Sequence, residues 1–200
     1  MARRRGPVHC GRAARYTARM PQPFTRLSRR VLVESSWHRY CQDQYVRADG
    51  SEGAYYYVDM PGSCGIVPVW EDGTTVLLRT WRYLLGGWIW EFPIGGMEAG
   101  DDPRSAAERE LEEETGLRAR TWHKLGEFAP YKGVSNERCR FFLARDLEQA
   151  EAHPEPEEAI TVHRMTLDEA RVRLFANQPL DGQSLCGLLL LERFLGEARC

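Results

Sequence analysis

The sequence has no closely spaced cysteine pair, no long hydrophobic run and no internal repeat, and each absence argues against a class of protein. Its six cysteines are scattered, with no histidines at zinc-ligand spacing, so we interpret them as reduced packing residues. The longest late apolar run, LCGLLLL, is far too short to cross a bilayer. The lack of repeats argues against a solenoid or propeller. We therefore expect a cytoplasmic protein that does not bind a membrane.

Acidic residues are also missing from the first 30 positions, which contain nine arginines. The rest of the chain has 18 basic and 29 acidic residues and carries about −11. A basic, acid-free start could be a mitochondrial presequence, an arm for nucleic acid or another acidic partner, or a solvated tail. We interpret residues 1–30 as a basic, disordered arm. Nucleic-acid binding is not expected, because the acidic remainder of the chain would repel a polyanion.

With 200 residues, of which 42% are hydrophobic and 28% charged, the chain is long enough for one compact globular domain. Segments rich in β-branched and aromatic residues predict strands between turn signals such as RADG and EDG, and periodic segments predict three helices. Many strands with few, separated helices indicate an α+β fold, an α/β/α sandwich in which helices flank a mixed β-sheet. The predicted strands cover residues 31–35, 54–60, 64–70, 75–82, 122–130, 138–147 and 160–165, and the predicted helices cover 103–115, 167–175 and 185–198.

The first predicted helix is unusually acidic. Asp102 can cap its first turn, Pro103 suits its first position, and Gly116 can end it in the left-handed region. Its C-terminal half carries RELEEETGL, residues 109–117, in which Glu110 and Glu114 are four positions apart. Residues at this spacing project from nearly the same face of a helix, so several carboxylates are brought together there.

Crowded carboxylates oppose helix formation. Like charges at this spacing cost about 0.2–0.5 kcal/mol a pair, and the dipole at the C-terminal end of a helix also disfavours anions. A divalent cation reverses the sign, because Mg²⁺ takes one or two carboxylates together with phosphate oxygens and water. The alternative is an ordinary solvated acidic face. The glycine-dense segment EFPIGGMEAGDD just before the helix favours a metal site, since its backbone can approach a ligand closely.

Together, the loop and the helix resemble the Nudix box, whose form is G-x5-E-x7-R-E-U-x-E-E-x-G-U with U apolar. The stretches VPVWEDGTTVLLRTWRYLLGGWIWEFPIGG and LGEFAPYKGVSNERCRFFLARDL look like segments of the ADP-ribose and nucleotide-sugar pyrophosphatase branch of that family. The resemblance covers about residues 30–196 and implies a small N-terminal antiparallel β-sheet at 31–62 and a Nudix hydrolase domain at 63–198. The matching positions are Gly95, Asp101, Arg109, Glu110, Leu111, Glu113, Glu114, Gly116 and Leu117.

The resemblance implies a metal site on the acidic helix. Glu110 and Glu114 would bind Mg²⁺ or Mn²⁺, and Glu113 would lie beside them as a ligand or an orienting group. The backbone carbonyl of Ile94 would complete the metal shell. Arg109, four positions before Glu113, would hold that carboxylate by an ion pair.

Other positions follow the family pattern less closely. Arg82 matches an arginine that would contact the diphosphate of the substrate. Trp81 stands where the family has Gln, Lys132 replaces a Pro, and Asp101 replaces a Glu. The first two changes alter the expected substrate pocket and leave the diphosphate chemistry in place. Three residues would support the loop and the end of the helix: Gly95, Asp101 and Gly116.

The resemblance also implies a general base from an acidic loop, which in this sequence begins near residue 151. Glu158 is the first candidate and Glu157 the second, with Glu113 in reserve because it neighbours the metals. A solvated acidic turn is the alternative for this loop. Trp37 could stack on a nucleobase within a dimer, whereas the other tryptophans are interpreted as packing residues. Glu137 is either a pocket residue or an ordinary surface residue.

These features predict a Mg²⁺-dependent Nudix hydrolase that cleaves a nucleoside diphosphate linked to a sugar, such as ADP-ribose, into a nucleoside monophosphate and a sugar phosphate. The resemblance also implies a homodimer. The alternative is a binding module of the same fold that senses such a nucleotide without cleaving it. The intact glutamates of the box argue against this alternative.

Overall fold

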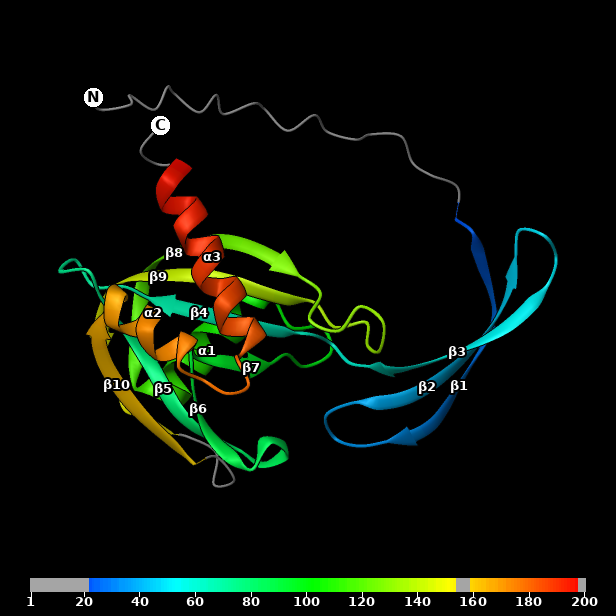
Figure 1. Ribbon diagram of the computed structural model, residues 1–200, viewed down its shortest axis with the longest axis horizontal. Coiled ribbons are helices and arrows are strands. Elements are labelled where there is room, and N and C mark those ends of the chain that lie inside the picture. The colour runs from blue at the N-terminus through cyan, green and yellow to red at the C-terminus, as the bar shows by residue number, and fades with distance from the viewer. Residues whose placement is uncertain (1–21, 154–158, 198–200) are drawn as a thin grey trace, which may run out of the picture.

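The computed structural model describes residues 22–153 and 159–197. Its N-terminal part is a three-stranded antiparallel sheet that projects from the rest of the molecule (Figure 1). The strands are β1 (Phe24–Glu34), β2 (Arg39–Arg47) and β3 (Glu52–Asp59). Strand β1 begins inside the segment that we expected to be a disordered arm, so that expectation is wrong for residues 24–30. Residues 1–21 lie outside the described part of the chain.

The body contains two further sheets. The first is mixed, in the order β7-β4-β9-β8, with β4 and β9 parallel and the other pairs antiparallel. The second is antiparallel, in the order β10-β5-β6, and a short 3-10 helix, η1 (Tyr83–Leu85), lies at the tip of the β5–β6 hairpin. The strands are β4 (Ser63–Pro68), β5 (Thr74–Arg82), β6 (Gly87–Glu91), β7 (Ile94–Gly96), β8 (Leu117–Phe128), β9 (Cys139–Gln149) and β10 (Ile160–Thr166).

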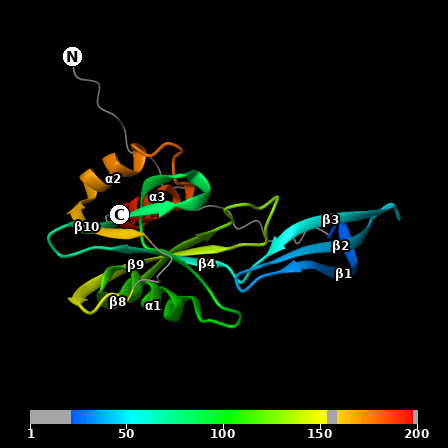
Figure 2. The same ribbon diagram turned by 90° about the horizontal axis from the view of Figure 1, so that it is seen from below.

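Three helices cover the strands on opposite sides: α1 (Pro103–Thr115), α2 (Leu167–Phe175) and α3 (Gly182–Glu197). Figure 2 shows α1 on one side and α2 and α3 on the other. Side chains alternate between the two faces of the central strands, and helices cover both faces, so these strands are buried on both sides. On β4, Ile66 packs in the cluster that contains Leu111 of α1, and Val67 packs with Leu174 of α2 and Leu188 of α3. The α+β sandwich of helices and mixed strands is therefore confirmed.

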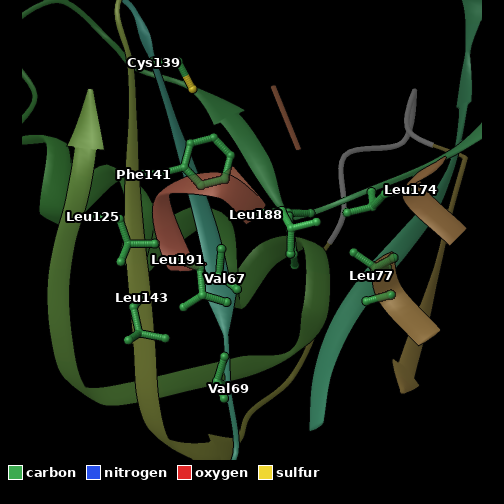
Figure 3. Packing of buried hydrophobic residues seen from close by; sticks show 12 residues of the cluster. Val67, Val69, Leu77, Leu125, Cys139, Phe141, Leu143, Leu174, Leu188 and Leu191 are labelled. Carbon is green, nitrogen blue, oxygen red and sulfur yellow. The ribbon is translucent and has the colours of Figure 1, made fainter. Parts of the chain in front are cut away.

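The apolar cluster that contains Val67 also contains Phe141 of β9, which Figure 3 shows together with Leu188. Its ring occupies a notch between two glycines, because a Cβ added at Gly65 or at Gly187 would lie 2.3 Å from it. Strand β4 and helix α3 can therefore approach the ring closely. The Ser184 hydroxyl at the start of α3 also accepts a hydrogen bond of 2.9 Å from the backbone N–H of Phe92. These contacts hold the start of α3 beside the end of β6.

The helix predictions were more accurate than the strand predictions. The first two helices have the expected bounds, and α3 begins three residues earlier than expected. Strands β2, β6 and β7 were not predicted. None of the helices in the described part of the chain combines the length and the apolar character needed to span a membrane.

Candidate active site

Helix α1 is held at both ends as the sequence indicated. The Asp102 side chain accepts a hydrogen bond of 3.1 Å from the backbone N–H of Ser105, and Pro103 lies in the first turn. At the other end Gly116 has a φ of 65°, and its N–H donates to the carbonyl of Glu112 at 2.8 Å. The positive φ suits glycine and ends the helix there. This places the acidic segment in the second half of α1.

The carboxylate of Glu110 lies directly against the backbone of β7. A Cβ added at Gly95 would be 1.9 Å from this carboxylate, so only glycine fits beside it. Glu114 is buried and the Glu110 side chain is 14% exposed, whereas Glu113 is 42% exposed. Two of the three glutamates therefore face the protein, and the third faces solvent. Burial, together with the negative charge of Glu110, raises the pKa of the Cys64 thiol to about 12, so this cysteine is neutral.

Arg109 connects the acidic helix to the loop before it. Its guanidinium lies 2.9 Å from Glu110, 3.6 Å from Glu113 and 3.5 Å from Asp101, and it donates to the carbonyl of Gly96 at 3.2 Å. The ion pair that we expected between Arg109 and Glu113 is thus present. Asp101 also accepts a hydrogen bond of 3.0 Å from the backbone N–H at position 98, within the loop. The positive charge of Arg109 therefore offsets part of the repulsion among these carboxylates.

A second ion pair lies beside the acidic helix. Arg82, at the end of β5, donates from Nε and Nη2 to the two carboxylate oxygens of Glu91 at 3.1 and 2.7 Å. Burial raises the pKa of Glu91, and the Arg82 charge lowers it in part. Burial lowers the pKa of Arg82, but Glu91, Glu114 and Asp181 together raise it above its ordinary value. Arg82 is therefore bound to Glu91 and attracted by the charges of Glu114 and Asp181.

The sequence prediction included Arg82 and missed Glu91. The signal was present, since WIWEFP places one carboxylate in an otherwise apolar segment. A charged residue in such a segment is buried only at a cost unless it is paired.

The remaining predicted residues are dispersed. Glu137, before β9, accepts hydrogen bonds from Ser63 at 2.7 Å and from Gln183 of α3 at 3.5 Å. Trp37 lies in the turn between β1 and β2, is 70% exposed, and has its N–H bonded to Ser35 of the same turn. The structure therefore brings the residues of the acidic helix and its loop together and does not join Trp37 to them. The two preferred candidates for the general base, Glu157 and Glu158, lie outside the described residues.

The donor groups at this site match a hard divalent cation. Glu110 offers carboxylate oxygens beside the backbone of β7, to which Ile94 belongs, and the missing Cβ of Gly95 leaves room for this approach. The buried carboxylate of Glu114 follows one turn later on α1. Mg²⁺ prefers such oxygens and completes its shell with phosphate and water. Over residues 22–153 and 159–197, no group of three or more His, Cys, Asp or Glu side chains is placed so that it could hold a metal ion. An open site of one or two carboxylates is the arrangement expected for a cation that binds together with a substrate.

A family model for the NUDIX domain matches residues 61–185. The sandwich fold, the glycine loop and the acidic helix define a hydrolase that acts on phosphoric anhydrides. The chain belongs to the Nudix family, in the ADP-ribose pyrophosphatase branch.

Two relatives and one solved structure are similar to this chain. The chain is 29% identical over 173 residues to the ADP-ribose pyrophosphatase of Mycobacterium tuberculosis, with 84% of this chain and 83% of that protein covered. It is 30% identical over 137 residues to the ADP-ribose pyrophosphatase of Bacillus subtilis, with 68% and 74% covered. A crystal structure described as an ADP compounds hydrolase superposes with a TM-score of 0.74 at 19% identity, covering 92% of this chain and all of that one. This last likeness concerns the fold alone.

Proposed function

We propose that this chain is a Mg²⁺-dependent pyrophosphatase that cleaves ADP-ribose or a related nucleoside diphosphate sugar into a nucleoside monophosphate and a sugar phosphate. The observation that carries the proposal is the packing of the Glu110 carboxylate against Gly95, next to buried Glu114. Repelling carboxylates gathered beside a glycine backbone suit a divalent cation and its phosphate ligand. The ADP-ribose pyrophosphatases among the relatives support the choice of substrate.

Each residue of the site has a role in this reaction. Glu110, Glu114 and the carbonyl of Ile94 would hold Mg²⁺ or Mn²⁺, which when bound supplies positive charge for the diphosphate and lowers the pKa of water. Arg109 holds the acidic side chains in place through the contacts described above. Arg82 would bind the diphosphate with the donors that its ion pair leaves available.

The proton acceptor is proposed among three glutamates. Glu158 and then Glu157 come first, because the resemblance implies a base in the acidic loop that contains them. Glu113 is the third candidate. It is more exposed than Glu110 and Glu114, and its carboxylate lies 3.6 Å from Arg109. Single Gln variants at the three positions, compared by kcat, would identify the base as the one with the largest loss.

The two ends of the substrate would be recognised by other parts of the molecule. A cavity of about 420 Å³ lies between the N-terminal sheet and the glycine loop, lined among others by Arg39, Asp59 and Met97. Residues of the N-terminal sheet and of the glycine loop therefore line one cavity. Glu137 would act as a pocket residue. Trp37, which is exposed, would stack on the nucleobase once a homodimer forms.

The proposed activity is tested with ADP-ribose and Mg²⁺, with AMP and ribose phosphate as the expected products. Glu114→Gln should lower the rate by at least about 100-fold, because a metal ligand is lost. Glu108→Gln is the matched control, since Glu108 is 47% exposed on the same helix and pairs only with Arg104 among the described ion pairs. It should leave the rate unchanged, and EDTA should stop the reaction. A folded wild type that binds ADP-ribose and cleaves no diphosphate would establish the sensor instead.

A further inference from the structure

The ion pair between Arg82 and Glu91 spans an unusual distance along the sheet. In the β5–β6 register, Glu91 is opposite Leu78 and Arg82 is opposite Gly87. Four residues, or about 13 Å of extended strand, therefore separate Arg82 from the position that faces Glu91. The two side chains nevertheless meet at 2.7 and 3.1 Å. The Arg82 side chain must lie along the sheet and point back from the hairpin tip toward the body.

Nothing else at the hairpin tip would direct Arg82 in this way. The next two residues, Tyr83 and Leu84, are 87% and 93% exposed, and Gly87 opposite has no side chain to pack against it. An arginine in such a position would extend into water, where its charge is best solvated. Held by Glu91, its guanidinium lies close enough to Glu114 for that carboxylate to raise the pKa of Arg82.

Glu91 is also a costly residue for stability alone. It is 3% exposed and lies between the apolar neighbours Trp90 and Phe92. A buried ion pair is often no more stable than well-packed apolar side chains of the same volume. The pair is therefore better explained by the placement of Arg82 than by the stability of the fold.

We infer that Glu91 is a positioning residue that fixes the direction of the Arg82 guanidinium for binding the substrate diphosphate. The inference rests on the proposed function. A guanidinium has five N–H donors, and Glu91 takes one from Nε and one from Nη2. Three donors remain, and they can bind phosphate oxygens while the fork is held in one plane.

The test is a double-mutant cycle with Glu91→Gln and Arg82→Ala. We would measure kcat and KM for ADP-ribose with Mg²⁺, and the Kd for inorganic pyrophosphate by calorimetry. Each single variant should raise KM and Kd by about 10-fold or more, with a smaller change in kcat. The double variant should bind no more weakly than Arg82→Ala, because Glu91 acts only through Arg82.

Glu112→Gln is the matched control. Glu112 also holds an arginine by two hydrogen bonds, from Nε and Nη2 of Arg118, on the exposed surface of α1. Its removal should change neither KM nor Kd. If Glu91→Gln fails to fold, Glu91→Asp replaces it; this variant keeps the charge but is one methylene too short, and should show an intermediate rise in KM.

Several outcomes overturn the inference. Effects of Glu91→Gln and Arg82→Ala that multiply in the double variant would show that Glu91 acts independently of Arg82. An unchanged KM and Kd in a folded Glu91 variant would show that Arg82 needs no orientation. If the wild type does not cleave ADP-ribose, the proposed function fails while pyrophosphate binding still tests the pair. A wild type that neither cleaves ADP-ribose nor binds pyrophosphate overturns both.

Discussion

Gly95 and Gly96 are neighbours on β7, but their surroundings differ. A Cβ at Gly95 would lie 1.9 Å from the Glu110 carboxylate, and a Cβ at Gly96 would have nothing within 4 Å. We predict that Gly95→Ala lowers kcat/KM by about 100-fold, because Glu110 must move by an ångström or more from its place. Gly96→Ala is the matched control and should keep wild-type activity. Steady-state kinetics with ADP-ribose and melting curves of both variants check this.

A Gly95→Ala protein with full activity would contradict the role given to Glu110. The melting curves separate this result from a folding defect. Since the Glu110 side chain can rotate away from β7, we expect the melting temperature of Gly95→Ala to fall by only a few degrees, which corresponds to about 1 kcal/mol.

Among single residues, the sequence identified those whose roles depend on helical spacing. Glu110, Glu113 and Glu114 could be found because a helix brings residues three and four positions apart together. Glu91 could not be linked to Arg82, because their contact depends on the register of two strands and on a side chain that reaches four residues along the sheet. Neither of these is encoded in local spacing.

At the level of secondary structure, α1 was predicted to the residue because its end signals are local. An Asp-Pro start and a glycine stop each depend on their own backbone conformation. Strands β1 and β2 gave weaker signals. Strand β1 contains several arginines and is almost entirely exposed, so its first half was interpreted as part of the basic arm. Strand β2, RYCQDQYVR, is largely polar, and only its pairing with β1 and β3 makes it a strand.

The end of α1 allows a stability prediction. Gly116→Ala should destabilise the protein by about 1–2 kcal/mol, because its φ of 65° is unfavourable for a residue with a Cβ. The added Cβ would also lie 3.1 Å from the carbonyl oxygen of Ala150. Urea unfolding measures the loss. Gly133→Ala, where a Cβ meets nothing within 4 Å and no positive φ is found, should show no comparable change.

Asp59 joins strands of the N-terminal sheet to each other and to the body, which also bonds to the sheet through the backbone of Val58. Asp59, at the end of β3, lies 2.6 Å from Arg29 and 2.7 Å from Arg39, and it accepts a hydrogen bond of 2.7 Å from Asn136. Burial alone would raise the pKa of Asp59, but the hydrogen bonds from these partners lower it below its ordinary value. A depressed pKa in the folded state stabilises the protein above the unfolded pKa. This stabilisation is lost as the pH falls through the folded pKa.

We therefore predict that urea stability falls when the pH is lowered below about 4, and that Asp59→Asn removes part of this change. At neutral pH, Asp59→Asn should cost about 1–3 kcal/mol, the range for lost hydrogen bonds to a charged group. Glu52→Gln, at the exposed start of β3 in the same sheet, serves as the control. If lowering the pH reduced the urea stability of Asp59→Asn as much as that of the wild type, Asp59 would not contribute to the pH dependence.

As a whole, the molecule consists of a well-packed body and a sheet with little core of its own. The body has two apolar clusters on opposite sides of its central strands. In the N-terminal sheet, Cys41 and Asp59 are the buried residues of the three strands, and neither belongs to these clusters. An isolated three-stranded sheet needs an apolar face that is covered. Its side chains Phe24, Leu27, Val31, Val33, Tyr40, Tyr55 and Tyr56 are instead 42–65% exposed.

This exposure leads to the prediction that the protein is a homodimer joined through the N-terminal sheet. Apolar surface of this extent is rare on a monomer and marks an interface, because covering it releases water at about 25 cal/mol per Å². Sedimentation equilibrium should give twice the mass of the chain. Leu27→Asp combined with Val33→Asp should give the monomer, since a buried unpaired charge opposes association. Val172→Asp, equally exposed at 67% on α2 of the body, should remain a dimer. A monomeric wild type at about 10 μM would contradict the prediction, because an interface of standard size that binds at micromolar Kd is half occupied near that concentration.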